Sequence, residues 1–223
     1  MEERYARNVP ALTNAECTCL RQKCVLVAGC GGLGGHIIDQ LARIGIGAIR
    51  AVDGDTFDTS NLNRQLLSEM ALLGTGKAKA AEDRVRRVNP DVQIQAVQDY
   101  ITADNVRSLI AGCDAVLDGL DNIAGRKLLA EACAEAGIPY IYGAICGWVA
   151  QAAVSMPGDA LMEKLYPEDT VLTDRSVLSF TPALCASMQV SLCVRLLAGR
   201  PVESGRVYYY DLLNQEFETI PLG

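Results

Sequence analysis

The chain has 223 residues, of which 50% are hydrophobic and 21% are charged, and its formal net charge is −7 at pH 7. This composition predicts a folded protein with a sizeable core and excludes a chain that is disordered throughout. The negative charge disfavours nucleic acid and anionic membranes, so we expect neither as a partner. The first twelve residues contain no apolar run, and no stretch of roughly 20 apolar residues follows, so we expect a cytoplasmic protein.

Histidine and cysteine usage narrows the possible chemistry. The sequence contains one histidine, His36, which excludes multi-histidine metal sites and HExxH proteases. We expect His36 to be a partly buried helix residue without a catalytic role. The nine cysteines are expected to be reduced thiols, because no secretion signal accompanies them. Cys17 and Cys19 are spaced C-x-C and no C-x-x-C pair occurs, so no structural zinc is expected.

Short apolar runs alternate with helical patterns along the first two thirds of the chain. Strands are predicted at residues 23–28, 48–52, 92–97, 115–117 and 139–142. Helices are predicted at residues 36–44, 77–88 and 124–136. Strands that alternate with helices predict an α/β fold with a doubly wound, mostly parallel, Rossmann-like sheet that is covered on both faces.

The last third of the chain departs from this alternation. Residues 155–175 contain prolines and several acids without clear periodicity, and they predict a long crossover loop, which is more often functional than idle. A helix is predicted over residues 180–198. Strand-like runs at residues 206–211 and 215–220 predict a C-terminal antiparallel hairpin. We therefore expect one domain over residues 1–223.

A glycine-rich loop follows the first predicted strand. Residues 29–35 read G-C-G-G-L-G-G, which satisfies G-x-G-x-x-G between a strand and a helix. Backbone N–H groups of such a loop approach a phosphate at the positive end of the helix. Asp53 follows the second strand, about 20 residues further on, where a carboxylate can accept hydrogen bonds from ribose hydroxyls. A nucleotide is therefore expected, and both NAD and ATP are compatible with these features.

Charged and amide side chains follow the glycine loop. They are Asn61, Asn63, Arg64, Gln65 and Lys77, and then Asp118 and Asp121 after the fourth strand. Taken singly, Arg64 could be a surface charge, Lys77 a residue of a helix N-terminus and Asp121 a helix N-cap. Hydride transfer needs neither the cations nor the carboxylates. Departure of pyrophosphate needs both, because Arg and Lys neutralise phosphates and Asp can hold Mg²⁺, so the combination favours ATP.

These motifs together resemble the ubiquitin-activating-enzyme superfamily, in particular the bacterial ThiF/MoeB/HesA adenylyltransferases. The resemblance covers essentially the whole chain. Its motifs are R-Y-A-R-N at residues 4–8, the glycine loop, V-D-G-D at 52–55, S-N-L-N-R-Q at 60–65, G-K at 76–77, D-G-L-D-N at 118–122, Arg126, Y-G-A at 142–144 and L-L-A-G at 196–199.

The resemblance implies an ATP- and Mg²⁺-dependent adenylyltransferase. Its substrate would be the C-terminal Gly-Gly carboxylate of a ubiquitin-like sulfur carrier protein of the ThiS or MoaD type, with release of pyrophosphate. The implied ATP-binding residues are Gly31, Gly34, Asp53, Asp55, Asn61, Arg64, Gln65 and Lys77, and the implied Mg²⁺ ligand is Asp121. Arg7 would reach the ATP of the other subunit of a homodimer from an arm formed by residues 1–22. So short and polar a segment is not expected to order against its own core.

The sequence departs from the resemblance in its cysteines. Relatives often carry two zinc-binding C-x-x-C pairs, which this chain lacks. They also often carry a cysteine just before the late helix, where this chain has Asp174. Cys146, Cys185 and Cys193 are expected in the core. We therefore expect the adenylated carrier to be released to a separate sulfur donor, without a thioester to the enzyme.

Two other functions are compatible with the sequence. One is adenylation of a small-molecule or tRNA-linked carboxylate, which the unusual segment at residues 155–175 favours. The other is a non-catalytic nucleotide-binding scaffold or an NAD-dependent sensor, which Arg64, Lys77 and Asp121 argue against.

Overall fold

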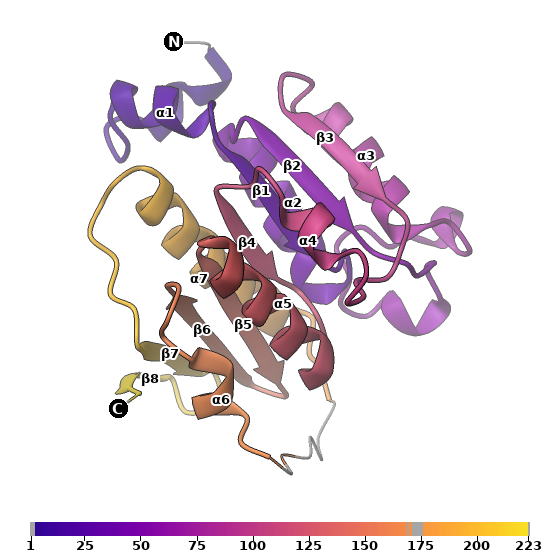
Figure 1. Cartoon of the computed structure of the whole chain (residues 1–223). Coiled ribbons are helices and arrows are strands. Elements are labelled where there is room, and N and C mark those ends of the chain that lie inside the picture. The colour runs from indigo at the N-terminus through magenta and orange to yellow at the C-terminus, as the bar shows by residue number, and fades with distance from the viewer. Residues whose placement is uncertain (1–2, 169, 171–175, 223) are drawn as a thin grey trace.

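The computed structural model describes residues 3–168, 170 and 176–222 of the chain. Its centre is an eight-stranded sheet with the strand order β3-β2-β1-β4-β5-β6-β7-β8 (Figure 1). The strands are β1 (Cys24–Ala28), β2 (Ala48–Val52), β3 (Gln93–Val97), β4 (Ala115–Asp118), β5 (Tyr140–Cys146), β6 (Val149–Ser155), β7 (Arg206–Asp211) and β8 (Glu216–Pro221). The predicted doubly wound, mostly parallel sheet with a C-terminal antiparallel hairpin is confirmed.

The order of the strands reverses between β1 and β4. β1 pairs in parallel with β2, with Cys24 opposite Ala48, and with β4, with Val25 opposite Ala115. β3 pairs in parallel with β2, and β5 with β4. The last three strands each pair antiparallel with the strand before them. The chain thus winds outward from β1 to β3 and then returns to β4, and such a reversal leaves a crevice at the carboxyl ends of the strands.

Helices cover both faces of the sheet (Figure 1). One face carries α1 (Asn14–Leu20), α2 (Gly32–Ile44), α3 (Lys77–Val88) and α7 (Phe180–Leu197). The other face carries α4 (Val106–Ile110), α5 (Ile123–Ala136) and α6 (Leu161–Leu165). The 3₁₀ helices are η1 (Glu3–Asn8), η2 (Thr59–Asn61) and η3 (Met70–Leu72).

The local sequence explains where the two helices beside the crevice begin and end. α2 follows the glycine loop and ends at Gly45, whose φ of 88° is left-handed. α5 begins after Asn122, whose side chain accepts a hydrogen bond from the Gly125 N–H at 2.8 Å. It ends at Gly137, which also has a left-handed φ, of 71°.

Helix α7 forms much of the core on its face of the sheet. Among the described helices, it is long and apolar enough to cross a membrane, with a mean hydropathy of 1.4 over 18 residues. However, 56% of that stretch is buried inside the protein, and Cys185 and Cys193 are fully buried. α7 packs against α2, β5 and β6, which is the environment of a core helix.

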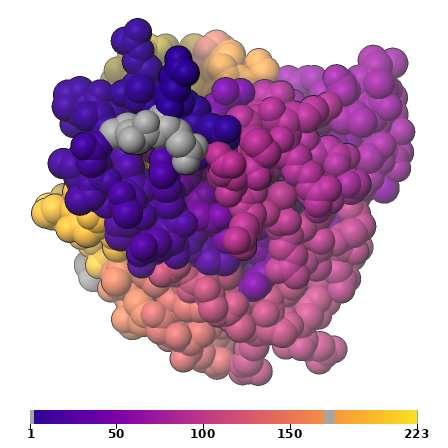
Figure 2. Space-filling model, turned by 90° about the horizontal axis from the view of Figure 1, so that it is seen from above, coloured from indigo at the N-terminus to yellow at the C-terminus, as the bar shows by residue number. Residues whose placement is uncertain are grey.

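The N-terminal segment packs against its own chain, so the expectation that it would not order there is wrong. Tyr5 is only 3% exposed, and its hydroxyl accepts a hydrogen bond from Asn89 Nδ2 at 2.7 Å. Arg4 pairs with Asp91 at 3.0 Å, and Leu20 is fully buried. Figure 2 shows the indigo N-terminal part of the chain lying directly beside the magenta middle part. The segment is ordered because the side chains of Tyr5 and Leu20 are buried, although most of the residues around them are polar.

The remaining differences from the predicted elements concern short or small-residue segments. Strand β6 was not predicted, and neither were helices α1, α4 and α6. The crossover segment at residues 155–175 is not a structureless loop throughout, because Leu161 and Met162 of α6 are buried in the core. Asp174 lies outside the described residues.

Candidate active site

A cavity of about 840 Å³ opens at the carboxyl ends of β1, β2, β4 and β5. Its volume lies within the usual range for small-ligand sites, roughly 300–1,000 Å³. The predicted site residues that line it are Gly31, Asp53, Asp55, Arg64, Gln65, Lys77 and Asp121. Gly34, Asn61 and Arg7 do not belong to its wall.

The glycine loop is packed so tightly that it presents backbone rather than side chains to the cavity. Gly29 has a φ of +87°, and a Cβ on it would lie 2.8 Å from Gly119 O. A Cβ on Gly34 would lie 1.7 Å from Gly29 O, so Gly34 sits behind the loop and lets α2 rest on it. A Cβ on Gly31 would meet only the Gln65 side chain, at 3.5 Å. The first turn of α2 therefore lies against the cavity, as phosphate binding requires.

Asp53 links the glycine loop to the end of β2. Its carboxylate accepts hydrogen bonds from the N–H of Cys30 at 2.6 Å and from the N–H of Asp55 at 2.8 Å. Burial raises the pKa of Asp53 above its ordinary value, although both N–H groups and Lys77 oppose this. The residue thus fixes the loop and also lies in the cavity wall, where a ribose hydroxyl would meet it.

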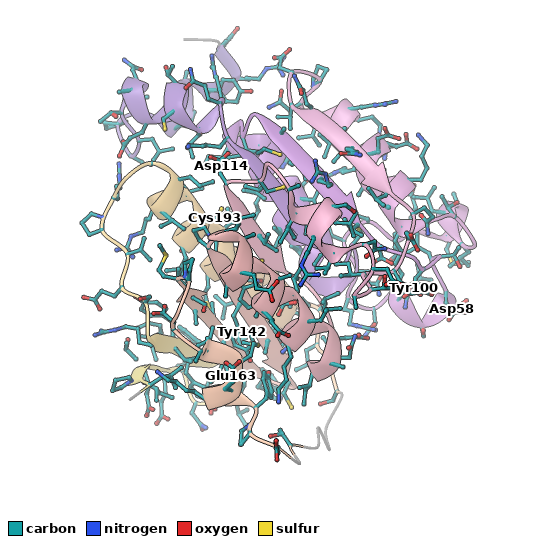
Figure 3. All side chains as sticks on the ribbon, in the orientation of Figure 1. Asp58, Tyr100, Asp114, Tyr142, Glu163 and Cys193 are labelled. Atoms are coloured by element: carbon teal, nitrogen blue, oxygen red, sulfur yellow. The ribbon has the colours of Figure 1, made fainter. Side chains whose placement is uncertain are left out.

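Lys77 places a buried cation in the same wall. Its side chain is 9% exposed, and its Nζ pairs with Asp55 Oδ2 at 3.0 Å. The hydroxyl of Tyr100 donates to the other oxygen of Asp55 at 2.6 Å, and this bond, helped by Lys77, lowers the pKa of Asp55. The Tyr100 ring lies so close to Gly54 that a Cβ there would lie 2.8 Å from it. Tyr100, labelled in Figure 3, lines the cavity and was not predicted.

Arg64 and Gln65 lie beside the glycine loop, where a Cβ on Gly32 would lie 3.7 Å from Arg64 and one on Gly31 3.5 Å from Gln65. The Arg64 guanidinium donates to Ser60 O at 3.0 Å and to Asn63 Oδ1 at 2.9 Å. Gln65 is 7% exposed, and its Oε1 has no hydrogen-bond partner among the residues that the structure describes. An unpaired buried amide oxygen in a cavity wall is expected where a ligand supplies the missing donor. Asn61, in contrast, uses its Oδ1 to accept from the Asp58 N–H at 3.0 Å and stabilises η2.

Asp121 is an exposed carboxylate at the edge of the cavity. It accepts a long hydrogen bond, of 3.4 Å, from Asn122 Nδ2. Among the described residues, no three His, Cys, Asp or Glu side chains cluster as a metal cage would require. Mg²⁺ fits this arrangement because it commonly takes one or two carboxylates and completes its shell with phosphates and water.

Asp118, which was predicted at this edge, lies beneath the cavity rather than in its wall. It is fully buried, and it pairs with Arg126 at 3.4 Å and accepts from the Tyr140 hydroxyl at 2.7 Å. Burial raises the pKa of Asp118, although Arg126 and Tyr140 oppose this. Arg126 itself reaches the cavity together with Tyr142 and Tyr166.

The cavity continues away from the glycine loop into a second half. The residues that line this half are Tyr142, Ala144, Ile145, Cys146, Val149, Gln151, Leu165, Tyr166 and Val177. All of these side chains are uncharged, and the Arg126 guanidinium adds one positive charge beside Tyr142 and Tyr166. This half could therefore hold a neutral chain whose reactive end points toward the nucleotide half.

The structure confirms the predicted burial of two cysteines and contradicts that of a third. Cys185 and Cys193 are fully buried, as expected, and burial raises the pKa of each to about 12. Cys146 is exposed and lines the cavity, so its predicted place in the core is wrong. The physical reason is that β5 runs past Tyr142 and ends at Cys146, at the rim of the cavity.

His36 and Arg7 lie away from the cavity of this chain. His36 is a partly buried residue of α2, as expected, and burial lowers its pKa. Arg7 is exposed in η1, next to Asn8, whose side chain donates to Ile44 O at the far end of α2. The 13 residues of α2 span about 20 Å, so Arg7 is remote from the glycine loop of its own chain. Its action on a second subunit stays a prediction.

Residues 5–223 match the ThiF family. The SAMP-activating enzyme E1 of Haloferax volcanii is 36% identical over 207 residues, which cover 88% of this chain and 76% of that protein. The molybdopterin-synthase adenylyltransferase of Salmonella typhimurium is 33% identical, with 91% of this chain and 84% of that protein covered. The chain spans 55% of the probable adenylyltransferase/sulfurtransferase MoeZ of Mycobacterium tuberculosis, at 34% identity.

Solved structures support the fold. The Escherichia coli MccB structure with ATP superposes with a TM-score of 0.86, and it covers all of this chain and 72% of that one. The two sequences are 18% identical, so this likeness concerns the fold alone.

Proposed function

Because the chain belongs to the ThiF family and is, through that membership, an adenylyltransferase, we propose that it uses ATP and Mg²⁺ to activate the C-terminal Gly-Gly carboxylate of a ubiquitin-like sulfur carrier protein. The carboxylate attacks the α-phosphate, the bond to the β-phosphate breaks, and pyrophosphate leaves. The acyl-adenylate that forms is a good acceptor for a sulfur nucleophile, whereas the carboxylate is not.

The observation that carries this proposal is that one cavity joins two differently lined halves. The glycine loop, Asp53, Arg64 and Lys77 line the half that suits a nucleotide. β5, β6 and the end of α6 line the other half with uncharged residues, beside which Arg126 places one guanidinium. A carboxylate at the end of a neutral chain would therefore meet the α-phosphate where the halves join.

Each charged group has a distinct task in the proposed reaction. Lys77 and Arg64 stabilise the negative charge that develops on the departing pyrophosphate. Lys77 is held in place by Asp55 at 3.0 Å before ATP binds, so it exchanges part of that pairing for a phosphate. Asp121 is the residue that would hold Mg²⁺, which supplies charge neutralisation to the phosphates.

The substrate separates this proposal from its alternatives. A Gly-Gly tail carries no side chains and no charge before its terminal carboxylate, which suits a half of the cavity whose wall is uncharged apart from Arg126. The names of two relatives, a SAMP-activating enzyme and a molybdopterin-synthase adenylyltransferase, also favour a protein carrier over a small-molecule or tRNA-linked carboxylate. A hydride-transferring sensor would leave Lys77 and Arg64 without a task.

Carboxylate-dependent exchange of ATP with labelled pyrophosphate tests the proposal. Wild type is assayed alone, with candidate carrier proteins and with carriers that lack the terminal glycine. Substitution of Arg64, Lys77 or Asp121 by Ala is expected to reduce exchange by about 10²–10³-fold with the fold retained. Lys79→Ala is the matched control, because Lys79 lies on the exposed side of α3 and pairs with Asp83 at 2.7 Å.

Each outcome of the exchange assay either supports one of the functions or refutes the mechanism. Exchange that requires an intact carrier supports the proposal. Exchange with small carboxylates alone would move the function to the first alternative. Wild-type exchange in all three cavity variants would refute the mechanism.

A further inference from the structure

Helix α6 is connected to the loop that carries Asp121 by a continuous series of hydrogen bonds. Tyr166 follows α6, and its hydroxyl accepts from Arg126 Nη1 at 2.8 Å. Nη2 of the same guanidinium donates to Leu120 O at 2.6 Å. Leu120 directly precedes Asp121, so two hydrogen bonds separate α6 from the proposed Mg²⁺ ligand.

The middle of this connection is rigid because Leu120 is held at both of its backbone polar groups. Its N–H donates to Asp118 Oδ1 at 2.8 Å, and its carbonyl is held by Arg126. Asp118 and Arg126 pair at 3.4 Å with side chains that are 0% and 6% exposed. Breaking one partner of so buried a pair is costly, so the loop is expected to move only when Arg126 moves.

The other end of the connection lies in the cavity. The hydroxyls of Tyr142 and Tyr166 are 2.6 Å apart, and the two rings meet edge to face with centroids 6.2 Å apart. The guanidinium carbon of Arg126 lies 5.4 Å from the centre of the Tyr142 ring. In Figure 3, Tyr142 lies between α5 and α6. Leu165 and Tyr166 both line the second half of the cavity, so whatever fills that half contacts the α6 end directly.

Helix α6 is short enough for this contact to matter. It has five residues, and only Leu161 and Met162 among them are buried. Tyr166, itself only 7% exposed, adds the hydroxyl contacts to Arg126 and Tyr142 that help to seat the helix.

We propose that Tyr166 is a positioning residue: its hydroxyl, acting through Arg126, holds the Leu120–Asp121 loop in the orientation that binds Mg²⁺-ATP. Seating of α6 against the cavity thereby sets the affinity for the nucleotide. The inference rests on the proposed function only in naming Mg²⁺-ATP as the ligand.

Tyr166→Phe removes the hydroxyl and keeps the ring. The dissociation constant of a non-hydrolysable ATP analogue with Mg²⁺, measured by calorimetry, is expected to rise about tenfold, which is the loss of one hydrogen bond to a charged group. The KM for ATP should rise in parallel with little change in kcat. Amide hydrogen exchange of residues 119–122 should accelerate. These three changes distinguish positioning from a loss of stability alone.

Tyr5→Phe is the matched control. Tyr5 is also buried, and its hydroxyl also has a buried partner, Asn89 at 2.7 Å, but it lies at the opposite end of α2 from the cavity. It should lose similar stability and keep wild-type affinity for the analogue. Tyr142→Phe should add little once Tyr166 is already Phe, because the Tyr142 hydroxyl contributes through Tyr166.

The inference is overturned if Tyr166→Phe binds the analogue within twofold of wild type, if Tyr5→Phe loses as much affinity, or if wild type binds no Mg²⁺-ATP analogue. Failure of the proposed function has a different signature. There, wild type binds the analogue and Tyr166→Phe weakens binding, but no carboxylate supports pyrophosphate exchange.

Discussion

Substitution of Gly34 by Ala tests whether the glycine loop and α2 pack as tightly as the structure shows. The added Cβ would lie 1.7 Å from Gly29 O and 2.6 Å from Gly29 C. Ordinary contacts of a Cβ begin near 3.4 Å, so about 1.7 Å of movement is needed. Neither side can yield easily, because Gly29 N–H is bonded to Val52 O at 2.7 Å and Gly119 closes the other side of the loop.

The expected loss of stability follows from two opposing effects. Overpacking typically costs about 1–3 kcal/mol, and a clash with backbone belongs at or above the upper end of that range. The Ala side chain regains about 1 kcal/mol through its higher helix propensity. The net loss for Gly34→Ala is therefore about 2 kcal/mol or more, a large part of the 5–15 kcal/mol that is typical of whole domains.

Urea unfolding followed by circular dichroism measures this loss, and analogue binding measures its effect on the cavity. Gly32→Ala is the control, because its Cβ would meet Arg64 and Pro182 only at ordinary contact distances of 3.7 Å. It should unfold at the same urea concentration as wild type or a higher one. If Gly34→Ala falls within 0.5 kcal/mol of Gly32→Ala, the close packing of α2 on the loop is refuted.

Three further outcomes are expected. Mixing Arg7→Ala chains with Lys77→Ala chains should restore about one working site per mixed dimer if Arg7 acts across a two-fold interface. If mixed dimers form but recover no activity, Arg7 does not have that role. Alkylation of Cys24 should be half-maximal near pH 7, because the Cys113 thiol 4.0 Å away lowers the pKa of Cys24 to about 7. Cys113→Ala removes this hydrogen-bond donor and should move the midpoint upward, and an unmoved midpoint would exclude that cause. Denaturing mass spectrometry after incubation with ATP, Mg²⁺ and carrier should show no thiol-cleavable adduct, and an adduct that maps to Cys146 would contradict release of the adenylate.

The nucleotide half of the site could be predicted because its signals are local. The glycine loop and Asp53 stand at the ends of consecutive strands, and a parallel sheet brings such ends together. Lys77 could be placed for the same reason, since it begins the helix that follows β2. Gly34 is a partial exception. The motif marks it correctly as a required glycine, but only the structure shows that it contacts Gly29 O rather than the cavity.

The other half of the site could not be predicted because it depends on contacts distant in the sequence. Strand β6 consists mainly of Val and Ala with one Gln and gives no clear alternation, although Gly147, with a φ of 52°, marks the turn before it. Tyr166 meets Arg126 across 40 residues, and nothing in either local sequence announces the pairing. The exposure of Cys146 likewise follows from how far β5 extends, which short-range patterns do not specify.

The position of α7 has a consequence for how the chain is synthesised. This helix packs on α2, and its Gln189 donates to Asp118 O at 2.7 Å and to Ile141 O at 3.1 Å, thereby joining β4 to β5 from behind. A ribosome delivers residues in order, so the parallel strands emerge long before residue 180. Until then the side of α2 that faces α7 has no cover. The nascent nucleotide-binding half is therefore expected to need a chaperone or to remain open, and a fragment that ends before Phe180 is expected to aggregate rather than to bind ATP.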